Sequence, residues 1–293
     1  MITISIDETH HILNDVPLYN TRYTKVMSFH NNIAPVQLKD QAFFINTKNE
    51  KLFNCTYLKA YGFYEGFAAV CDEKGWFHIK MNGSHLYSQR YPWIGNFQES
   101  LCVVRDCDYN YFHINSEGTR IYQENYSYTG DFKYSIAVVI NNKGNSTHIN
   151  TQGKTLHNKY FEELEIFHKG YAVAKDCQGF FHIDKNGDEL YSQRYQKLEP
   201  FYNGVALATS FKNQKIIINE KDIEQTILTQ EIINKTKILN ESFDYFNYQI
   251  LFSILKLDVL KNLNEKKSIS LPAISKKIIF RWLNLQNIIN VDF

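Results

Sequence analysis

The chain has 293 residues, with 32 basic and 31 acidic side chains and a formal net charge of +1. Such a balanced charge argues against wholesale electrostatic binding to nucleic acid or to an anionic membrane. The five cysteines have no regular pair spacing, which argues against a disulfide framework and predicts reduced thiols in a cytoplasmic setting. We expect neither a signal peptide nor a bilayer-spanning segment, because no apolar stretch is long enough for either.

Aromatic residues recur at intervals of 34 or 35 residues from about Tyr23 to about Ile218. One aromatic column is Phe29, Phe63, Phe97, Phe132, Phe167 and Phe201. A second column, six residues earlier, is Tyr23, Tyr57, Tyr91, Tyr126, Phe161 and Tyr195. A small residue follows the first column after five positions: Ala34, Ala68, Cys102, Ala137, Ala172 and Ala206. These columns predict a β domain over residues 1–220 that contains six tandem repeats, near 19–54, 55–90, 91–125, 126–159, 160–194 and 195–220.

Each repeat contains the pattern of a small antiparallel sheet. The run after the Phe is apolar at consecutive positions, as in Leu101–Val104, which is typical of a strand covered on both faces. A second strand such as Tyr111–Ile114 leads into a turn with Gly at a fixed place, here Gly118. A short third strand such as His85–Tyr87 closes the unit. We therefore predict three-stranded meanders, with a fourth segment near the Tyr column.

Strands that are apolar on both faces cannot stand alone, so the repeats must stack on their neighbours. Radial stacking gives a propeller, and linear stacking gives an open β-solenoid. Six copies suit ring closure, and the N-terminal strand Ile2–Ile6 can then complete a blade from the far end. A period of 35 residues is short for a four-stranded blade, so both forms stay open, with the propeller slightly favoured.

The repeat resembles the WG-type β repeat of bacterial proteins, whose copies read G-x-A-x-V, then an aromatic–glycine pair, then Ile-Asp and a Gly turn. The matching stretches are Gly66–Val70 with Gly75–Ile79, and Gly170–Val173 with Gly179–Asp184. The resemblance covers about residues 19–220. It departs in placing His where the family more often has Tyr, and in lacking Gly at positions 32, 100 and 135. It implies a recognition or scaffold module rather than a reaction.

After Glu220 the period stops, and residues 221–293 contain helical patterns. Phe246, Ile250, Ile254 and Leu257 follow the spacing of an amphipathic helix. We predict a small helical, winged-helix-like domain, which is similar to the N-terminal dimerisation domain of small-molecule methyltransferases. The resemblance implies a homodimer formed through residues 221–293. No Gly-rich loop for S-adenosylmethionine follows, so no cofactor is expected.

The histidines and arginines of the repeat are the candidate binding residues. Four histidines share one column of the second strand: His78, His113, His148 and His182. In a ring they could converge on a metal or an anion, but a repeat copies its scaffold, so bonds to backbone or tyrosine are favoured and no metal is predicted. Three arginines precede the Tyr column: Arg22, Arg90 and Arg194. The candidate pairs are Arg90 with Tyr91 and Arg194 with Tyr195. They either stack on aromatic rings or line a groove for an anionic or peptide ligand.

The sequence contains no Walker loop, GxGxxG, GxSxG or HExxH motif, so it offers no complete catalytic or cofactor motif. The first hypothesis is a non-catalytic scaffold that binds a protein or peptide through an aromatic repeat surface. One alternative is an accessory or substrate-recognition part of a methyltransferase system. Another is a DNA-binding regulator with a ligand-sensing repeat domain.

Overall fold

The computed structural model describes residues 2–220 and 225–228. Every element in these ranges is a β-strand, which confirms a mainly β chain, and no helix suited to crossing a bilayer occurs in them. Two compact units divide the chain: residues 1–178 with 182–189, and residues 179–181 with 190–293. Apart from one short strand at Gln225–Leu228, the predicted helical domain of residues 221–293 lies outside the described residues.

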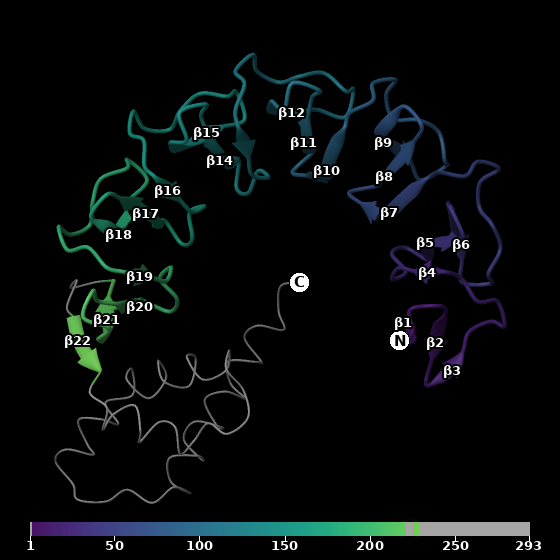
Figure 1. Ribbon diagram of the computed structural model, residues 1–293, viewed down its shortest axis with the longest axis horizontal. Coiled ribbons are helices and arrows are strands. Elements are labelled where there is room, and N and C mark those ends of the chain that lie inside the picture. Colours follow the sequence, from purple (N-terminus) through teal and green to yellow (C-terminus); the bar gives the residue numbers. More distant parts are fainter. Residues whose placement is uncertain (1, 221–224, 229–293) are drawn as a thin grey trace, which may run out of the picture. The chain divides into compact units, whose positions relative to one another are not determined.

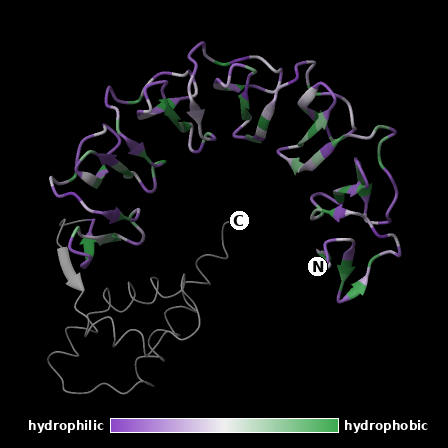
Figure 2. Cartoon of the chain, in the orientation of Figure 1, coloured by the Kyte–Doolittle hydropathy of each residue, from purple (hydrophilic) through white to green (hydrophobic). Residues whose placement is uncertain are grey.

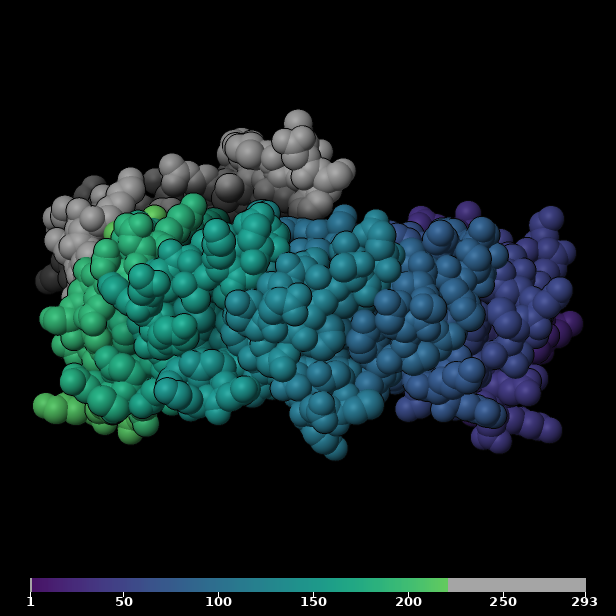
Figure 3. All heavy atoms as spheres, turned by 90° about the horizontal axis from the view of Figure 1, so that it is seen from above, coloured from purple at the N-terminus to yellow at the C-terminus, as the bar shows by residue number. Residues whose placement is uncertain are grey.

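Seven antiparallel sheets follow one another in chain order, where six repeats were predicted. The first four are β1 (Ile2–Ile4), β2 (His11–Leu13), β3 (Val16–Pro17); β4 (Lys25–Val26), β5 (Ile33–Leu38), β6 (Gln41–Asn46); β7 (Lys59–Tyr64), β8 (Phe67–Asp72), β9 (Gly75–Lys80); and β10 (Trp93–Gln98), β11 (Leu101–Arg105), β12 (Tyr111–Ile114). The last three are β13 (Tyr128–Thr129), β14 (Ile136–Ile140), β15 (Ser146–Asn150); β16 (Glu163–Leu164), β17 (Ala172–Asp176), β18 (Gly179–Ile183); and β19 (Lys197–Leu198), β20 (Val205–Thr209), β21 (Lys215–Asn219), β22 (Gln225–Leu228). Within the first unit each sheet lies beside the next (Figure 1) and forms a contiguous band of colour (Figure 3).

The N-terminal strand belongs to a sheet of its own. β1 pairs with β2, with Ile2 opposite Leu13 and Ile4 opposite His11, and β2 pairs with β3. The prediction that this strand completes a distant blade is therefore replaced by a seventh, smaller meander at the start of the chain.

The strand order inside a repeat differs from the predicted one. The Phe column lies in or just after a first strand, such as β10 with Phe97, which pairs with the apolar second strand. The expected closing strand His85–Tyr87 makes only an isolated bridge between His85 and Ile79. It is the start of a connecting segment that runs along the outer edge of β9.

That connecting segment touches the sheet again at the Tyr column. Trp76 and Tyr91 exchange both backbone hydrogen bonds, at 2.8 and 3.0 Å. Equivalent bridges occur in other repeats: Ala42 with Tyr57, Tyr111 with Tyr126, Ser146 with Phe161, and Phe180 with Tyr195. The predicted fourth segment is thus present as an interrupted strand bridged at its two ends.

The second strands form the core of the stack. In β8, three consecutive residues, Ala68, Ala69 and Val70, are buried, so both faces of the strand are covered. One hydrophobic cluster extends from Phe44 to Ile149 and includes residues of four successive sheets. Figure 2 shows the hydrophobic residues on the strands and mainly hydrophilic residues in the loops. The prediction that each repeat packs on its neighbours is confirmed over these sheets.

The turns between first and second strands place two consecutive residues at positive φ, as type I′ turns require. Glycine supplies this conformation at Gly66, Gly170 and Gly204, but Ser100 and Ser135 adopt it at φ of 64° and 61°. In both serine turns, the glutamate of the preceding repeat accepts two backbone hydrogen bonds. The oxygens of Glu65 accept from Glu99 N and Ser100 N, both at 2.8 Å, and those of Glu99 accept from Tyr134 N and Ser135 N. The carboxylate compensates for the strain that glycine relieves elsewhere.

This arrangement predicts that Glu65→Ala lowers the free energy of unfolding by about 1–2 kcal/mol, because two charge-assisted hydrogen bonds are lost. The control is Glu73→Ala, which removes an exposed glutamate of the same charge and should change stability by less than about 0.5 kcal/mol. Urea midpoints of the two variants provide the measurement. Equal midpoints would contradict the role given to Glu65.

Candidate binding site

The repeated histidines lie in the interior of four different sheets, on β9, β12, β15 and β18, and each is at most 1% exposed. His78 Nδ1 lies 2.7 Å from the Tyr87 hydroxyl, and Nε2 lies 3.1 Å from the carbonyl oxygen of Gly95. A carbonyl oxygen can only accept, so Nε2 carries the proton and Nδ1 accepts from the tyrosine. The same two bonds recur for His113 with Tyr122 and Gly130, and for His148 with His157 and Glu165.

Each of these bonds serves to join neighbouring repeats. Gly95 lies on β10 of the following sheet, so His78 ties its own sheet to the next one. The partner Tyr87 packs beneath the next Gly turn, where a Cβ placed on Gly118 would lie 2.8 Å from the Tyr87 Cβ. Gly118 therefore needs to be glycine both for its φ of 73° and for this close approach.

Burial keeps the three histidines neutral. It lowers the pKa of His78, His113 and His148 to about 4, although the backbone hydrogen bond of each ring favours the charged form. A neutral ring can donate from one nitrogen and accept at the other, which is the pattern that the three sites show. The structure thus gives these residues a role inside the repeat.

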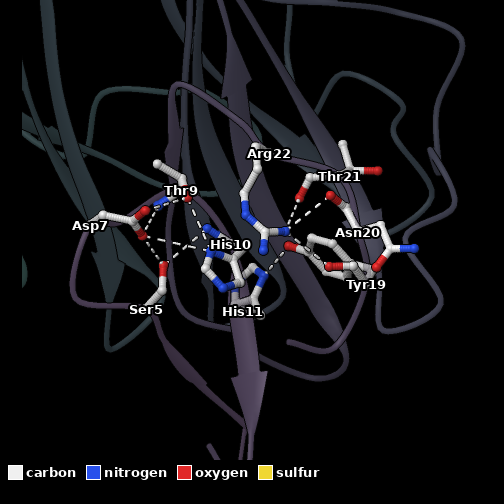
Figure 4. Close-up of polar contacts among 9 residues, drawn as sticks. All are labelled: Ser5, Asp7, Thr9, His10, His11, Tyr19, Asn20, Thr21 and Arg22. Carbon is white, nitrogen blue, oxygen red and sulfur yellow. Dashed lines mark hydrogen bonds and ion pairs between the residues drawn. The ribbon is translucent and has the colours of Figure 1, made fainter. Parts of the chain in front are cut away.

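The N-terminal sheet carries a copy of the same arrangement. His11 is buried, and its ring bonds the Tyr19 hydroxyl at 2.5 Å and the Met27 carbonyl oxygen at 2.8 Å. Figure 4 shows this pair, with the Arg22 guanidinium donating to the carbonyl oxygens of residues 19 to 21. The signal for this copy in the sequence is the dipeptide His11-Ile12, which matches the His-Ile of the later repeats.

One repeat replaces the polar pair with an apolar one. Phe44 occupies the histidine position and Phe53 the tyrosine position, with ring centroids 5.6 Å apart. Phe44 also contacts Phe63, at 5.2 Å, as His78 contacts Phe97. Because the histidine and the tyrosine are replaced together, neither remains as a buried polar group without its partner.

The arginines of the predicted site stack on aromatic rings. The Cζ of Arg90 lies 3.4 Å from the centroid of Phe77, and its Nε donates to Asp72 at 3.1 Å. Arg194 lies 3.6 Å over Phe181 and donates to the carbonyl oxygen of Ser192. Their neighbours in the prediction, Tyr91 and Tyr195, take part in the backbone bridges; Tyr91 is half-buried and Tyr195 buried. Guanidinium stacking, one of the two predicted alternatives, is confirmed.

A different set of residues lies at the exposed end of the sheets. The first residue of the first strand lies directly opposite a residue at or next to the end of the second strand, which in turn lies opposite a residue at or next to the start of the third. Three successive sheets carry Lys59, Cys71 and Trp76; Trp93, Arg105 and Tyr111; and Tyr128, Ile140 and Ser146 at these positions. The repeats differ from one another at these positions, in contrast to the buried columns.

Aromatic side chains gather at this end in three sheets. Tyr61 stacks on Trp76 at 5.3 Å with an interplanar angle of 12°. Tyr111 lies 5.8 Å from Trp93 and 5.9 Å from Tyr128, which belongs to the next sheet. Tyr61, Trp93 and Tyr128 are 45%, 41% and 49% exposed. We refer to these five residues as the aromatic row. Trp76 and Tyr111, and Trp93 and Tyr128, are each 35 residues apart, but the row was not predicted because only pairing across the strands brings the two positions together.

The comparison with known families agrees with a β-repeat architecture. The family "WG containing repeat" matches residues 43–76 and 183–210, which confirms the predicted resemblance in two stretches, and these matches do not extend to residues 221–293. No curated protein matches the sequence. Similar solved structures include the computationally designed Ika8 protein, at 14% identity over 78% of this chain and 82% of that one, with a TM-score of 0.41. BamB from Moraxella catarrhalis matches at 10% identity over 70% and 72%, with a TM-score of 0.40, and the WD40 β-propeller domain of Doa1 at 11% over 71% and 86%, with 0.32.

The buried pair predicts a double-mutant cycle at His113 and Tyr122. Each single replacement by Phe leaves a buried polar partner unpaired and should lower the free energy of unfolding by about 1–3 kcal/mol. The double variant reproduces the pair found at Phe44 and Phe53, so its loss should be smaller than the sum of the single losses. Urea unfolding at pH 7 provides the measurement, and strictly additive losses would contradict the pairing.

The same variants test the pH dependence. The folded-state pKa of His113 is lowered to about 4, so between pH 6.5 and 4 the unfolded chain binds the proton and the folded chain does not. Stability conferred by the neutral ring is therefore lost as the pH falls through this window, by up to about 1.4 kcal/mol per pH unit. His113→Phe with Tyr122→Phe should reduce this slope, and an unchanged slope would contradict a neutral His113.

Proposed function

We propose that this chain is a non-catalytic scaffold that binds a protein or peptide through the aromatic row. The observation that carries the proposal is that the repeated positions and the variable positions of the sheets have different surroundings. The repeated histidines and ring-stacked arginines are used inside the sheets, whereas the variable positions at one end expose tryptophan and tyrosine.

Exposed aromatic rings on a rigid sheet suit protein recognition. Tryptophan and tyrosine bury a large area on contact and lose few rotamers, and for this reason they dominate the energetics of many interfaces. Trp93 and Tyr128 begin the first strands of adjacent sheets, and Tyr111 contacts both rings. Contact among the rings limits their freedom before a ligand arrives, which lowers the entropic cost of binding.

The two other functions considered from the sequence are a methyltransferase accessory and a DNA-binding regulator. Both depend on residues 221–293, of which only the strand Gln225–Leu228 belongs to the described residues. No contact or surface of the described residues favours either function.

A library of random peptides displayed on phage and selected on the full-length chain tests the proposal. Synthetic copies of the selected peptides should bind Trp93→Ala and Tyr128→Ala at least about tenfold more weakly than the original chain, as expected for central interface aromatics. Calorimetric titration gives the dissociation constants.

The matched control is Tyr134→Ala. Tyr134 is 77% exposed and lies in the turn at the opposite end of the sheet that begins with Tyr128. This variant should bind the peptides as the original chain does. Peptides that bind all three variants with unchanged affinity would refute a binding role for the aromatic row.

A further inference from the structure

Arg105 is the last residue of β11, the central strand of a sheet that contributes Trp93 and Tyr111 to the aromatic row. It is directly opposite Trp93 on β10 and Tyr111 on β12, so the three side chains share one face of the sheet. Residues two strands apart are separated by about 9–10 Å in the backbone. The centroids of the Trp93 and Tyr111 rings are nevertheless only 5.8 Å apart, so the rings lean toward each other across the strand that carries Arg105.

Aromatic rings rather than hydrogen bonds surround the guanidinium of Arg105. Its Cζ lies 5.2 Å from the ring centroid of Tyr109 and 5.9 Å from that of Tyr111. Its Nε is shielded from solvent and has no hydrogen-bond partner among the described residues. An arginine held in this way keeps its capacity for new hydrogen bonds.

The other arginines of residues 2–220 are used differently. Arg22 and Arg120 donate to backbone carbonyl oxygens, Arg90 donates to Asp72 and to two carbonyl oxygens, and Arg194 donates to the carbonyl oxygen of Ser192. The side chain of Arg105 forms no ion pair or hydrogen bond within the described part of the chain, although the residue is half-buried. A half-buried guanidinium without an acceptor is stabilised when a ligand supplies one.

The charges around Arg105 indicate what kind of acceptor fits. The carboxylate of Asp106 is turned into its own loop, where it accepts from the backbone N–H groups of Asp108 and Asn110. Asp108 is exposed nearby in the sequence. One cation with acidic neighbours suits a single carboxylate, whereas a polyphosphate chain would meet repulsion from the two aspartates.

We propose that Arg105 anchors an aspartate or glutamate side chain of the bound peptide, while residues beside that acid pack on Trp93, Tyr111 and Tyr128. The inference rests on the proposed function and specifies its ligand: an extended acidic segment with apolar or aromatic residues next to the acid. The planar guanidinium can meet the carboxylate with two parallel hydrogen bonds, and the rings exclude water from that contact.

The probes are the synthetic phage-selected peptides, each paired with a version in which every Asp is Asn and every Glu is Gln. Acidic residues should be enriched in the selected peptides. The change from acid to amide should weaken binding to the full-length chain about tenfold or more, and should have little effect on binding to Arg105→Gln. Arg105→Lys keeps the charge without the planar fork and should bind with intermediate affinity.

Arg105→Gln should keep the chain folded with only a small loss of thermal stability, because it removes the contacts of the guanidinium with the Tyr109 and Tyr111 rings but no side-chain hydrogen bond. Peptides that depend on Trp93 but bind Arg105→Gln and the original chain equally would overturn the acidic anchor and leave the proposed function standing. Peptides whose affinity changes with neither Trp93→Ala nor Arg105→Gln would overturn both the acidic anchor and the proposed function.

Two other ligands of Arg105, a nucleic acid and a second copy of the chain, are tested separately. Binding of a fluorescein-labelled oligouridylate that is lost in Arg105→Gln would overturn the peptide in favour of a nucleic acid. Self-association of the full-length chain in sedimentation velocity, lost in the same variant, would overturn it in favour of a second copy of the chain.

Discussion

A neutral histidine that reaches from one sheet to the next is the interaction on which the rest of this structure depends. His78 accepts a hydrogen bond from Tyr87 within its own repeat and donates one to the carbonyl oxygen of Gly95 in the following repeat. The bond to Tyr87 is buried and the bond to Gly95 is partly buried, and the second bond is kept only while the two sheets keep their relative position. The bonds recur at His113 and His148, which makes the period of the sequence a consequence of a bonding geometry rather than of composition.

This dependence determines where the chain can vary. A side chain in the histidine column has a partner nine residues away and another seventeen residues away, so a change there requires matching changes, as at Phe44 and Phe53. Positions at the ends of the strands are not constrained by a pair of partners of this kind. Trp93, Arg105 and Tyr111 occupy positions that hold other residues in neighbouring sheets, and a binding surface can arise there without disturbing the interior.

The sequence predicted the features that repeat and missed those that register creates. The columns identified the strands, the glycine turns and the stacking, because each is copied at a fixed interval. The seventh sheet was missed because its strands, at residues 2–17, precede Tyr23 and Phe29, where the aromatic columns begin. The run His85–Tyr87 was interpreted as a strand although only His85 forms a bridge, since an apolar alternation cannot show whether a partner strand is present. The histidines predicted for the candidate site lie inside the sheets, and Arg90 and Arg194 stack on aromatic rings. The aromatic row joins positions such as Trp93 and Tyr111 that only pairing through β11 brings together.

The last sheet differs from the others in having a continuous fourth strand. Elsewhere the outer edge of the third strand is bridged at two points by the connecting segment, as with Ile79 to His85 and Trp76 to Tyr91. In the last sheet β22 instead pairs with β21 over four residues, from Lys215 opposite Leu228 to Ile218 opposite Gln225. An open strand edge is a template on which another polypeptide can add itself, and β22 covers this edge of β21. A chain cut after residue 220 would lose β22 and expose the edge of β21. The four residues of β22 lie outside the six repeats, yet their loss would raise the tendency of the chain to aggregate.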